Sequence, residues 1–199
     1  MLTPGPRDPG TQQNTLRPRR GRPFKDKVME TIKSRLIHLT ALCSDYCVTI
    51  ENAAELEFPE LVKSLLGYLP RIYFEFIDIE AEEDASIDEW GLSSPTSASS
   101  LDEDQYEMVR GQLSSIFGEN DTYLETFEKD MKYSDTPIAT SISENLADIY
   151  QPLYNFVVEV RESDGSSLED AYRECREQFD EYWSQTLCNA LRALNALRQ

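Results

Sequence analysis

Apolar residues recur every three or four positions over most of the chain beyond residue 27, and this spacing constrains the fold more than any other feature. Such a period places apolar side chains along one face of an α-helix, whereas a half-buried strand needs strict alternation. The first run predicts one long helix over residues 26–53, with its apolar face formed by Val28, Ile32, Leu36, Leu39, Cys43, Tyr46, Ile50 and Ala53. A helix of this kind must bury that face against other elements.

The second and third helices follow from the same spacing and from residues that start or stop helices. The second should begin at Pro59, which suits a first helical turn, and Pro70 should kink it or split it in two. Asp102 should cap the third helix, and Gly118 should end it.

The last two helices each follow a Ser-x-x-Glu pattern, which predicts a capping box. Ser141 with Glu144 opens the fourth helix, whose apolar stripe continues past Pro152, so we expect one kinked helix there. The final helix should begin at the box of residues 166–169 and run to the C-terminus. Its apolar side is predicted to consist of Leu168, Tyr172, Cys175, Phe179, Tyr182, Leu187, Ala190, Leu194 and Leu197.

The predicted fold is therefore all-α, a single helical bundle of about five helices. Strand signals are weak throughout, and residues 119–140 are expected to form a loop that packs on the bundle. In this interpretation residues 26–199 form an acidic helical domain. Residues 1–25 are rich in Pro, Gly and Arg and offer few apolar side chains, so they are predicted to be a disordered basic tail.

Charge is distributed unevenly along the chain. The formal net charge is −18, from 19 basic and 37 acidic residues. Residues 1–28 contain seven basic and two acidic residues, a net of +5, which leaves −23 for residues 29–199. An acidic body repels nucleic acid and anionic membranes and favours basic partners. No apolar run reaches the roughly 18 residues that span a bilayer, and residues 1–28 lack a signal peptide's apolar core, so we expect a cytoplasmic protein without membrane attachment.

The residues that usually carry catalysis or bind cofactors are scarce. The single histidine, His38, cannot build a His-based metal motif, and nothing in the sequence places it beside a cysteine as a catalytic base. No Gly-rich phosphate loop occurs among the eight glycines. We therefore expect no enzymatic activity, no cofactor and no metal site.

Two groups of residues have a plain structural interpretation and one functional alternative each. Residues 78–107 hold eleven acids and no Lys or Arg, which predicts a solvated acidic loop, with weak divalent-cation association as the alternative. The four cysteines lack a Cys-x-x-Cys spacing and are predicted to be buried free thiols, with a redox pair as the alternative. They are Cys43, Cys47, Cys175 and Cys188.

The best candidates for a functional surface are six polar or aromatic residues in the last two predicted helices: Glu144, Asn145, Asp148, Tyr182, Trp183 and Arg192. Glu144 and Asp148 lie four residues apart, where like charges repel unless a cation lies between them, and Arg192 is the candidate cation. The six residues form either a polar seam that fixes helix register or a recognition patch for a partner. The sequence leaves both interpretations open.

The stretches that carry these residues, SISENLADIYQPLYNF (141–156) and FDEYWSQTLCNALRALN (179–195), resemble the signature segments of a bacterial family of small acidic all-helical proteins of unknown function. The likeness extends more loosely over residues 29–199. It implies a helical, bacterial, cytoplasmic protein, and it brings no known activity or catalytic residue. Proteins of this kind begin close to their first helix, about where Met29 stands here.

The N-terminal segment contains Arg20-Gly21-Arg22-Pro23, which has the form of a hook for the DNA minor groove. A narrow A·T-rich minor groove attracts arginine, and a glycine between two arginines lets the backbone lie deep. The acidic body opposes such binding. We therefore expect that translation starts at Met29 or that residues 1–28 are a dispensable tail.

The sequence favours a non-catalytic protein-interaction module with an unidentified, basic protein partner. Two alternatives stay open. One is a DNA-associated protein that uses the hook, since nucleic acid is expected to bind only through the tail. The other is an acidic decoy that mimics nucleic acid for a basic partner.

Overall fold

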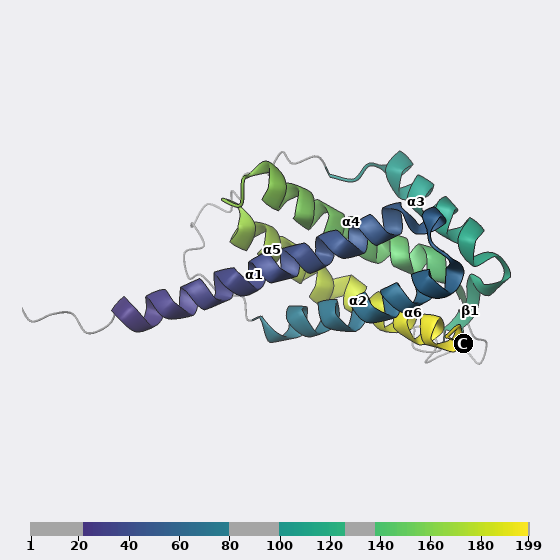
Figure 1. Ribbon diagram of the computed structural model, residues 1–199, viewed down its shortest axis with the longest axis horizontal. Helices are drawn as coiled ribbons and strands as arrows, with labels where there is room; N and C mark the ends of the chain where they lie inside the picture. Colours follow the sequence, from purple (N-terminus) through teal and green to yellow (C-terminus); the bar gives the residue numbers. More distant parts are fainter. Residues whose placement is uncertain (1–21, 80–99, 126–137, 199) are drawn as a thin grey trace, which may run out of the picture.

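The structure, a computed structural model, describes residues 22–79, 100–125 and 138–198 (Figure 1). The elements in chain order are α1 (Arg22–Glu51), η1 (Ala53–Glu55), α2 (Phe58–Asp78), α3 (Glu103–Phe117), η2 (Gly118–Asn120), β1 (Thr122–Glu125), β2 (Ile138–Ser141), α4 (Ile142–Glu162), α5 (Leu168–Gln178), η4 (Phe179–Trp183) and α6 (Ser184–Ala196). The last three follow one another without a break and form one helical rod, in which η4 is a π-helical turn. With α1 to α4, this rod gives the all-α bundle of five helices that the apolar spacing predicts.

Helix α4 lies at the centre of the bundle and packs against α1, α3, α5 and α6 (Figure 1). Its stripe of Ile142, Leu146, Ile149 and Leu153 is buried, and so is Tyr150 beside the stripe. A helix that is buried on more than one side is surrounded by other helices rather than laid on their surface. Helix α2 packs against α1 and α6, so α2 and α6 lie side by side on one flank.

The long helix α1 is tied to this centre through its apolar face. The predicted stripe is buried from Leu36 to Ile50, and Tyr46 in the middle of it is fully enclosed. The Tyr46 hydroxyl donates a 3.0 Å hydrogen bond to the carbonyl oxygen of Leu146 on α4. A buried phenol needs such a partner, and this bond fixes the register of α1 on α4.

Both internal prolines lie within continuous helices. Pro70 is exposed within α2, and Pro152 is buried within α4. Of the two outcomes predicted for Pro70, the split does not occur. The prediction of one helix through Pro152 is confirmed.

The predicted limits of α3 are confirmed. Asp102 Oδ1 accepts a 2.7 Å hydrogen bond from the Gln105 backbone N–H, and Gln105 Oε1 accepts one of 3.3 Å from the Asp102 backbone N–H. This reciprocal pair is a capping box. Gly118 ends the helix with a φ of 53°, a backbone conformation that side chains with a Cβ disfavour.

The two capping boxes predicted further along the chain differ in outcome. Ser141 caps α4, because its Oγ accepts a 3.3 Å hydrogen bond from the Glu144 backbone N–H, which is one of the two bonds of the predicted box. The box predicted over residues 166–169 is wrong, since α5 begins after Ser167 and the Ser167 side chain makes no capping bond. The turn at residues 163–166 uses its hydroxyls internally: the Ser166 Oγ–H donates to the carbonyl oxygen of Ser163 at 2.8 Å.

A small antiparallel sheet corrects the prediction of a loop over residues 119–140. Strand β1 pairs with β2, with Thr122 opposite Ser141 and Glu125 opposite Ile138. Strands of four residues are too short to display a clear alternation, and their stability comes from packing against a neighbouring element. The residues between the two strands, 126–137, lie outside the described part of the chain.

The π-turn η4 corrects the predicted apolar side of the last helix. Tyr182 is 58% exposed, whereas the next residue, Trp183, is fully buried. The buried residues Cys175, Phe179, Trp183 and Leu187 are each four positions apart. A regular helix has 3.6 residues per turn, so a run of fours drifts around its surface, and a wider π-turn keeps such a run facing the core.

All four cysteines are free. Cys43, Cys47 and Cys175 are buried as predicted, and burial raises the pKa of each of these thiols. Cys188 is exposed on α6, which corrects its predicted place in the core. Within residues 22–79, 100–125 and 138–198, no helix combines the length and apolar character needed to cross a membrane.

Candidate functional site

Asp148 joins three elements through its carboxylate. Its Oδ1 accepts a 2.7 Å hydrogen bond from the Tyr106 hydroxyl of α3, and its Oδ2 accepts a 2.6 Å bond from the Tyr182 hydroxyl of η4. Burial, followed by the bond to Asp148, raises the pKa of Tyr182 to about 12. Two predicted candidates, Asp148 and Tyr182, thus meet, and the carboxylate is satisfied by two phenols.

Asn145 and Arg192 meet on a residue that the sequence did not single out. The Asn145 side-chain amide donates to the Tyr123 hydroxyl of β1, and the Arg192 guanidinium lies 5.9 Å from the centre of the Tyr123 ring. Arg192 also forms a 3.1 Å ion pair with Glu125 Oε1 on the same strand. Arg192 therefore holds β1 against α6, a contact that required the unpredicted sheet.

Of the other candidate residues from the sequence, two have structural roles, and part of the proposed hook lies outside the described ranges. Trp183 is a core residue, with its ring edge-on to Phe76 at 4.9 Å and to Phe179 at 4.7 Å. Glu144 is exposed in the first turn of α4, where its carboxylate suits the helix dipole. In the proposed hook, residues 20 and 21 lie outside the described residues, and residues 22 and 23 begin α1.

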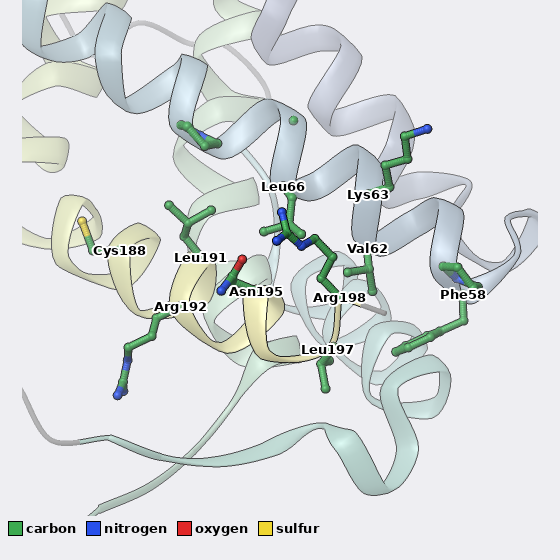
Figure 2. A pocket seen from close by; sticks show the side chains of 13 residues that line it. Phe58, Val62, Lys63, Leu66, Cys188, Leu191, Arg192, Asn195, Leu197 and Arg198 are labelled. Atoms are coloured by element: carbon green, nitrogen blue, oxygen red, sulfur yellow. The ribbon is translucent and has the colours of Figure 1, made fainter.

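A larger feature lies on the flank formed by α2 and α6. It is a groove of about 1050 Å³ between the two helices (Figure 2). Helix α2 contributes Phe58, Pro59, Val62, Lys63, Leu66, Gly67 and Pro70. Helix α6 and the residues after it contribute Cys188, Leu191, Arg192, Asn195, Leu197 and Arg198.

The groove combines an apolar lining with cationic charged groups. Leu66 of α2 and Leu191 of α6 both line it, and in Figure 2 the Arg198 side chain extends into the space between the two helices. Its charged lining residues, Lys63, Arg192 and Arg198, are all basic. Cys188 stands at the far end from Arg198, and partial burial raises the pKa of its thiol. The surface is therefore suited to binding an apolar group that carries negative charge.

The sequence of α2 contains an indication of this groove, which a search for one apolar stripe overlooks. Leu66 and Pro70 lie four residues apart beside the buried stripe of α2, with the exposed Gly67 next to them, whereas Val62, one turn earlier, is itself buried. An amphipathic helix normally carries charged residues at such exposed positions. The conspicuous part of this pattern is Gly67-x-x-Pro70, which puts a small residue and a proline at two exposed positions of α2 in place of charged side chains.

A second, smaller hollow of about 440 Å³ lies between α1 and α2 and is lined by residues that include Arg35, His38, Phe74 and Glu75. Arg35 forms ion pairs with Glu75 at 2.9 Å and with Asp78 at 2.8 Å. The charge of Arg35 is thus already neutralised within the chain. Because the hollow is lined by both basic and acidic side chains, it does not favour a ligand of one charge.

Possible metal ligands are spread through the described residues. Among residues 22–79, 100–125 and 138–198, no three His, Cys, Asp or Glu side chains are placed to hold a metal ion together. Residues 80–99, which carry much of the acidic zone considered for weak cation binding, lie outside the described ranges.

The chain matches a family model over almost all of its helical part. The model, described as a domain of unknown function (DUF5063), covers residues 30–199. The chain belongs to this family. The resemblance to a family of unknown function that the sequence indicated over residues 29–199 is thereby confirmed.

A solved structure shows the same fold. It is the crystal structure of protein BF1032 from Bacteroides fragilis, which is 27% identical to this chain with a TM-score of 0.68. The match covers 83% of this chain and 92% of that one. No curated protein matches the chain.

Proposed function

We propose that this DUF5063 protein is a non-catalytic protein-interaction module whose partner docks in the groove between α2 and α6. The observation that carries the proposal is the groove itself: two neighbouring helices leave an apolar trough of about 1050 Å³ on the surface of a highly charged protein. A charged protein gains solubility by covering its surface with polar groups, so an open apolar trough indicates a partner.

The residues of the groove support binding over catalysis. The described residues that line it include no histidine and no carboxylate, which are the usual general bases. The one thiol that lines it, Cys188, has a raised pKa and is therefore a weak nucleophile near neutral pH. We place the module in the cytoplasm, a proposal supported by four free cysteines.

The alternatives of a DNA hook and of an acidic decoy receive less support. The hook would be attached to residues 29–199, whose net charge of −23 repels DNA. The decoy requires a basic partner, and the cationic groove has the wrong sign of charge for it.

Gly67 provides a test that blocks the groove without disturbing the core. A Cβ atom added at Gly67 meets no other atom within 4 Å, and the same holds for Gly111 on α3, outside the groove. Gly67→Tyr should therefore fill the trough, whereas Gly111→Tyr is the matched control. Both variants and the wild type are purified by affinity from the source organism, and the recovered proteins are quantified by mass spectrometry.

We expect a specific partner to be recovered with the wild type and with Gly111→Tyr and to be lost with Gly67→Tyr. Circular dichroism and thermal unfolding establish that both variants keep the fold. Recovery of the same proteins in equal amounts on all three would show that the groove is not the docking site.

A further inference from the structure

The groove has the size of a helix rather than of a small molecule. Its α2 lining runs from Phe58 to Pro70, about 18 Å along the helix axis. Exposed residues, among them Gly67 and Pro70, line it, so it is open to solvent along α2. Pockets for small molecules enclose most of their ligand, whereas an open trough between two helices receives an amphipathic helix in recurrent modes of recognition.

The apolar surface continues along α2 beyond the groove. Gly67, Pro70, Phe74 and Ile77 follow one another at steps of three, four and three, so they share one side of the helix. Phe74 and Ile77 are each more than half exposed. An occupant that lies along α2 can therefore cover apolar side chains from Phe58 to Ile77, about 28 Å, which corresponds to a helix of about 18 residues.

Charge complementarity indicates which helix fits. The basic lining residues occur in a chain with almost twice as many acidic as basic residues. Arg192 is paired with Glu125, whereas Lys63 and Arg198 form no ion pair within the described residues. Two cations beside an apolar trough favour carboxylates on the occupant and oppose a basic segment.

A second copy of this chain fits the groove poorly. In a symmetric dimer the same surface patch meets itself, so Lys63 and Arg198 of one copy would face the same cations of the other. The two chains would also each bring a net charge of −18. Both effects are repulsive, which leaves a different protein as the better occupant.

We infer that the α2–α6 groove binds an acidic amphipathic helix of another protein, an inference that rests on the proposed function. The apolar residues of that helix, at positions i, i+3, i+4 and i+7, lie over the trough of Leu66 and Leu191 and over the exposed Phe74. Its Glu or Asp residues flank this stripe and pair with Lys63 and Arg198.

The probe for this inference is a displayed library of 18-residue helical peptides with a fixed Leu stripe. The other positions vary among Glu, Lys, Gln and Ala. Peptides are selected on the wild type at about 0.15 M salt, which screens charges farther apart than about 8 Å, and are counter-selected on Gly67→Tyr. Counter-selection removes peptides that bind the acidic surface outside the groove.

We expect the peptides that bind the wild type but not Gly67→Tyr to be enriched in Glu beside the Leu stripe. Binding of such a peptide should slow the alkylation of Cys188, the only exposed cysteine among four, all of which are described.

The double variant Lys63→Glu/Arg198→Glu should weaken the binding of such a peptide about tenfold or more, because two attractive contacts become repulsive. The control Lys33→Glu/Arg161→Glu makes the same change in net charge outside the groove and should change the affinity by about twofold or less.

The outcomes separate this inference from the proposed function. Groove-specific peptides that are neutral or enriched in Lys would overturn the inference of an acidic partner and leave the docking site standing. A selection in which counter-selection on Gly67→Tyr removes every peptide that binds the wild type would overturn both. Thermal unfolding of each variant accompanies the binding data, so that a loss of fold is not mistaken for a loss of docking.

Discussion

The guanidinium of Arg192 on α6 lies 3.1 Å from Glu125 Oε1 on β1, and the two side chains differ greatly in exposure. Arg192 is 45% exposed, whereas Glu125 is 1% exposed. A buried carboxylate is costly without a cation or donor, so the solvent-facing arginine stabilises a charge that would otherwise be poorly solvated. This relationship favours the interpretation of Arg192 as part of a seam that holds the sheet to the bundle.

Arg192→Ala should lower the free energy of unfolding by about 1–3 kcal/mol, because the variant leaves the buried Glu125 carboxylate without this charged donor. Urea denaturation measures the change. Arg173→Ala is the matched control, since Arg173 is also 45% exposed but pairs at 2.9 Å with Asp170, which is 78% exposed. An exposed pair of this kind contributes at most about 0.5 kcal/mol. Equal losses in the two variants would contradict the role assigned to Arg192.

The capping pattern gives a second prediction with its own internal control. Asp102→Ala should cost about 1 kcal/mol, because the Asp102 side chain satisfies a free N–H at the start of α3. Ser167→Ala should change the stability by less than about 0.5 kcal/mol, since the Ser167 side chain forms no capping bond. Chemical denaturation of the two variants measures both losses in the free energy of unfolding. A Ser167→Ala loss as large as that of Asp102→Ala would show that α5 is capped by its serine in solution.

The same comparison shows which parts of the fold the sequence determines locally. The stripe from Leu36 to Ile50 and the cap at Asp102 depend on residues close together in one helix, and the sequence predicts both. The bond from Asp102 to Gln105 needs only local backbone geometry. Ser166, the serine of the predicted Ser-x-x-Glu box, does not cap α5 because its hydroxyl donates to the carbonyl oxygen of Ser163 within the preceding turn, which the pattern does not encode.

Features that depend on contacts between two distant segments could not be predicted from the sequence. Strand β1 exists because β2 pairs with it and because Arg192 and Asn145 bind its side chains across the bundle. The π-turn at η4 was hidden for a different reason: both Tyr182 and Trp183 suit an apolar stripe, and packing against Phe76 selected the tryptophan. The α2–α6 groove needs two helices to lie side by side, which no single stripe reveals.

The bonds around Asp148 predict a pH dependence. The pKa of Tyr182 is raised from 10.0 to about 12, by burial and then by Asp148, so the folded state favours the protonated phenol. The resulting stabilisation is present in full below pH 10 and is lost as the pH rises through about 12. The melting temperature should therefore fall over this window, and differential scanning fluorimetry measures it.

Asp148→Asn isolates the electrostatic part of this effect. Removing the negative charge should lower the pKa of Tyr182 toward 10, while burial keeps it above that value. The absorbance of tyrosinate near 295 nm is followed against pH, and subtracting the curve of the same protein with Tyr182→Phe leaves the titration of Tyr182 alone. Asp170→Asn, on α5, serves as the charge control. An unchanged Tyr182 titration in Asp148→Asn would mean that the hydrogen bond does not persist in solution.

The change in the free energy of unfolding on Gly→Ala substitution should differ in sign among three glycines. Gly67 and Gly111 lie within helices with open space at the Cβ position, so Gly→Ala at either should raise the free energy of unfolding by about 0.5–1 kcal/mol. Gly118 has a φ of 53°, so Gly118→Ala should lower it by about 1 kcal/mol or more despite similar open space. Thermal and urea unfolding of the three variants measure these signs. A destabilising Gly67→Ala would mean that another group occupies the space beside Gly67 in solution, and the α2–α6 groove would then be closed in the free protein.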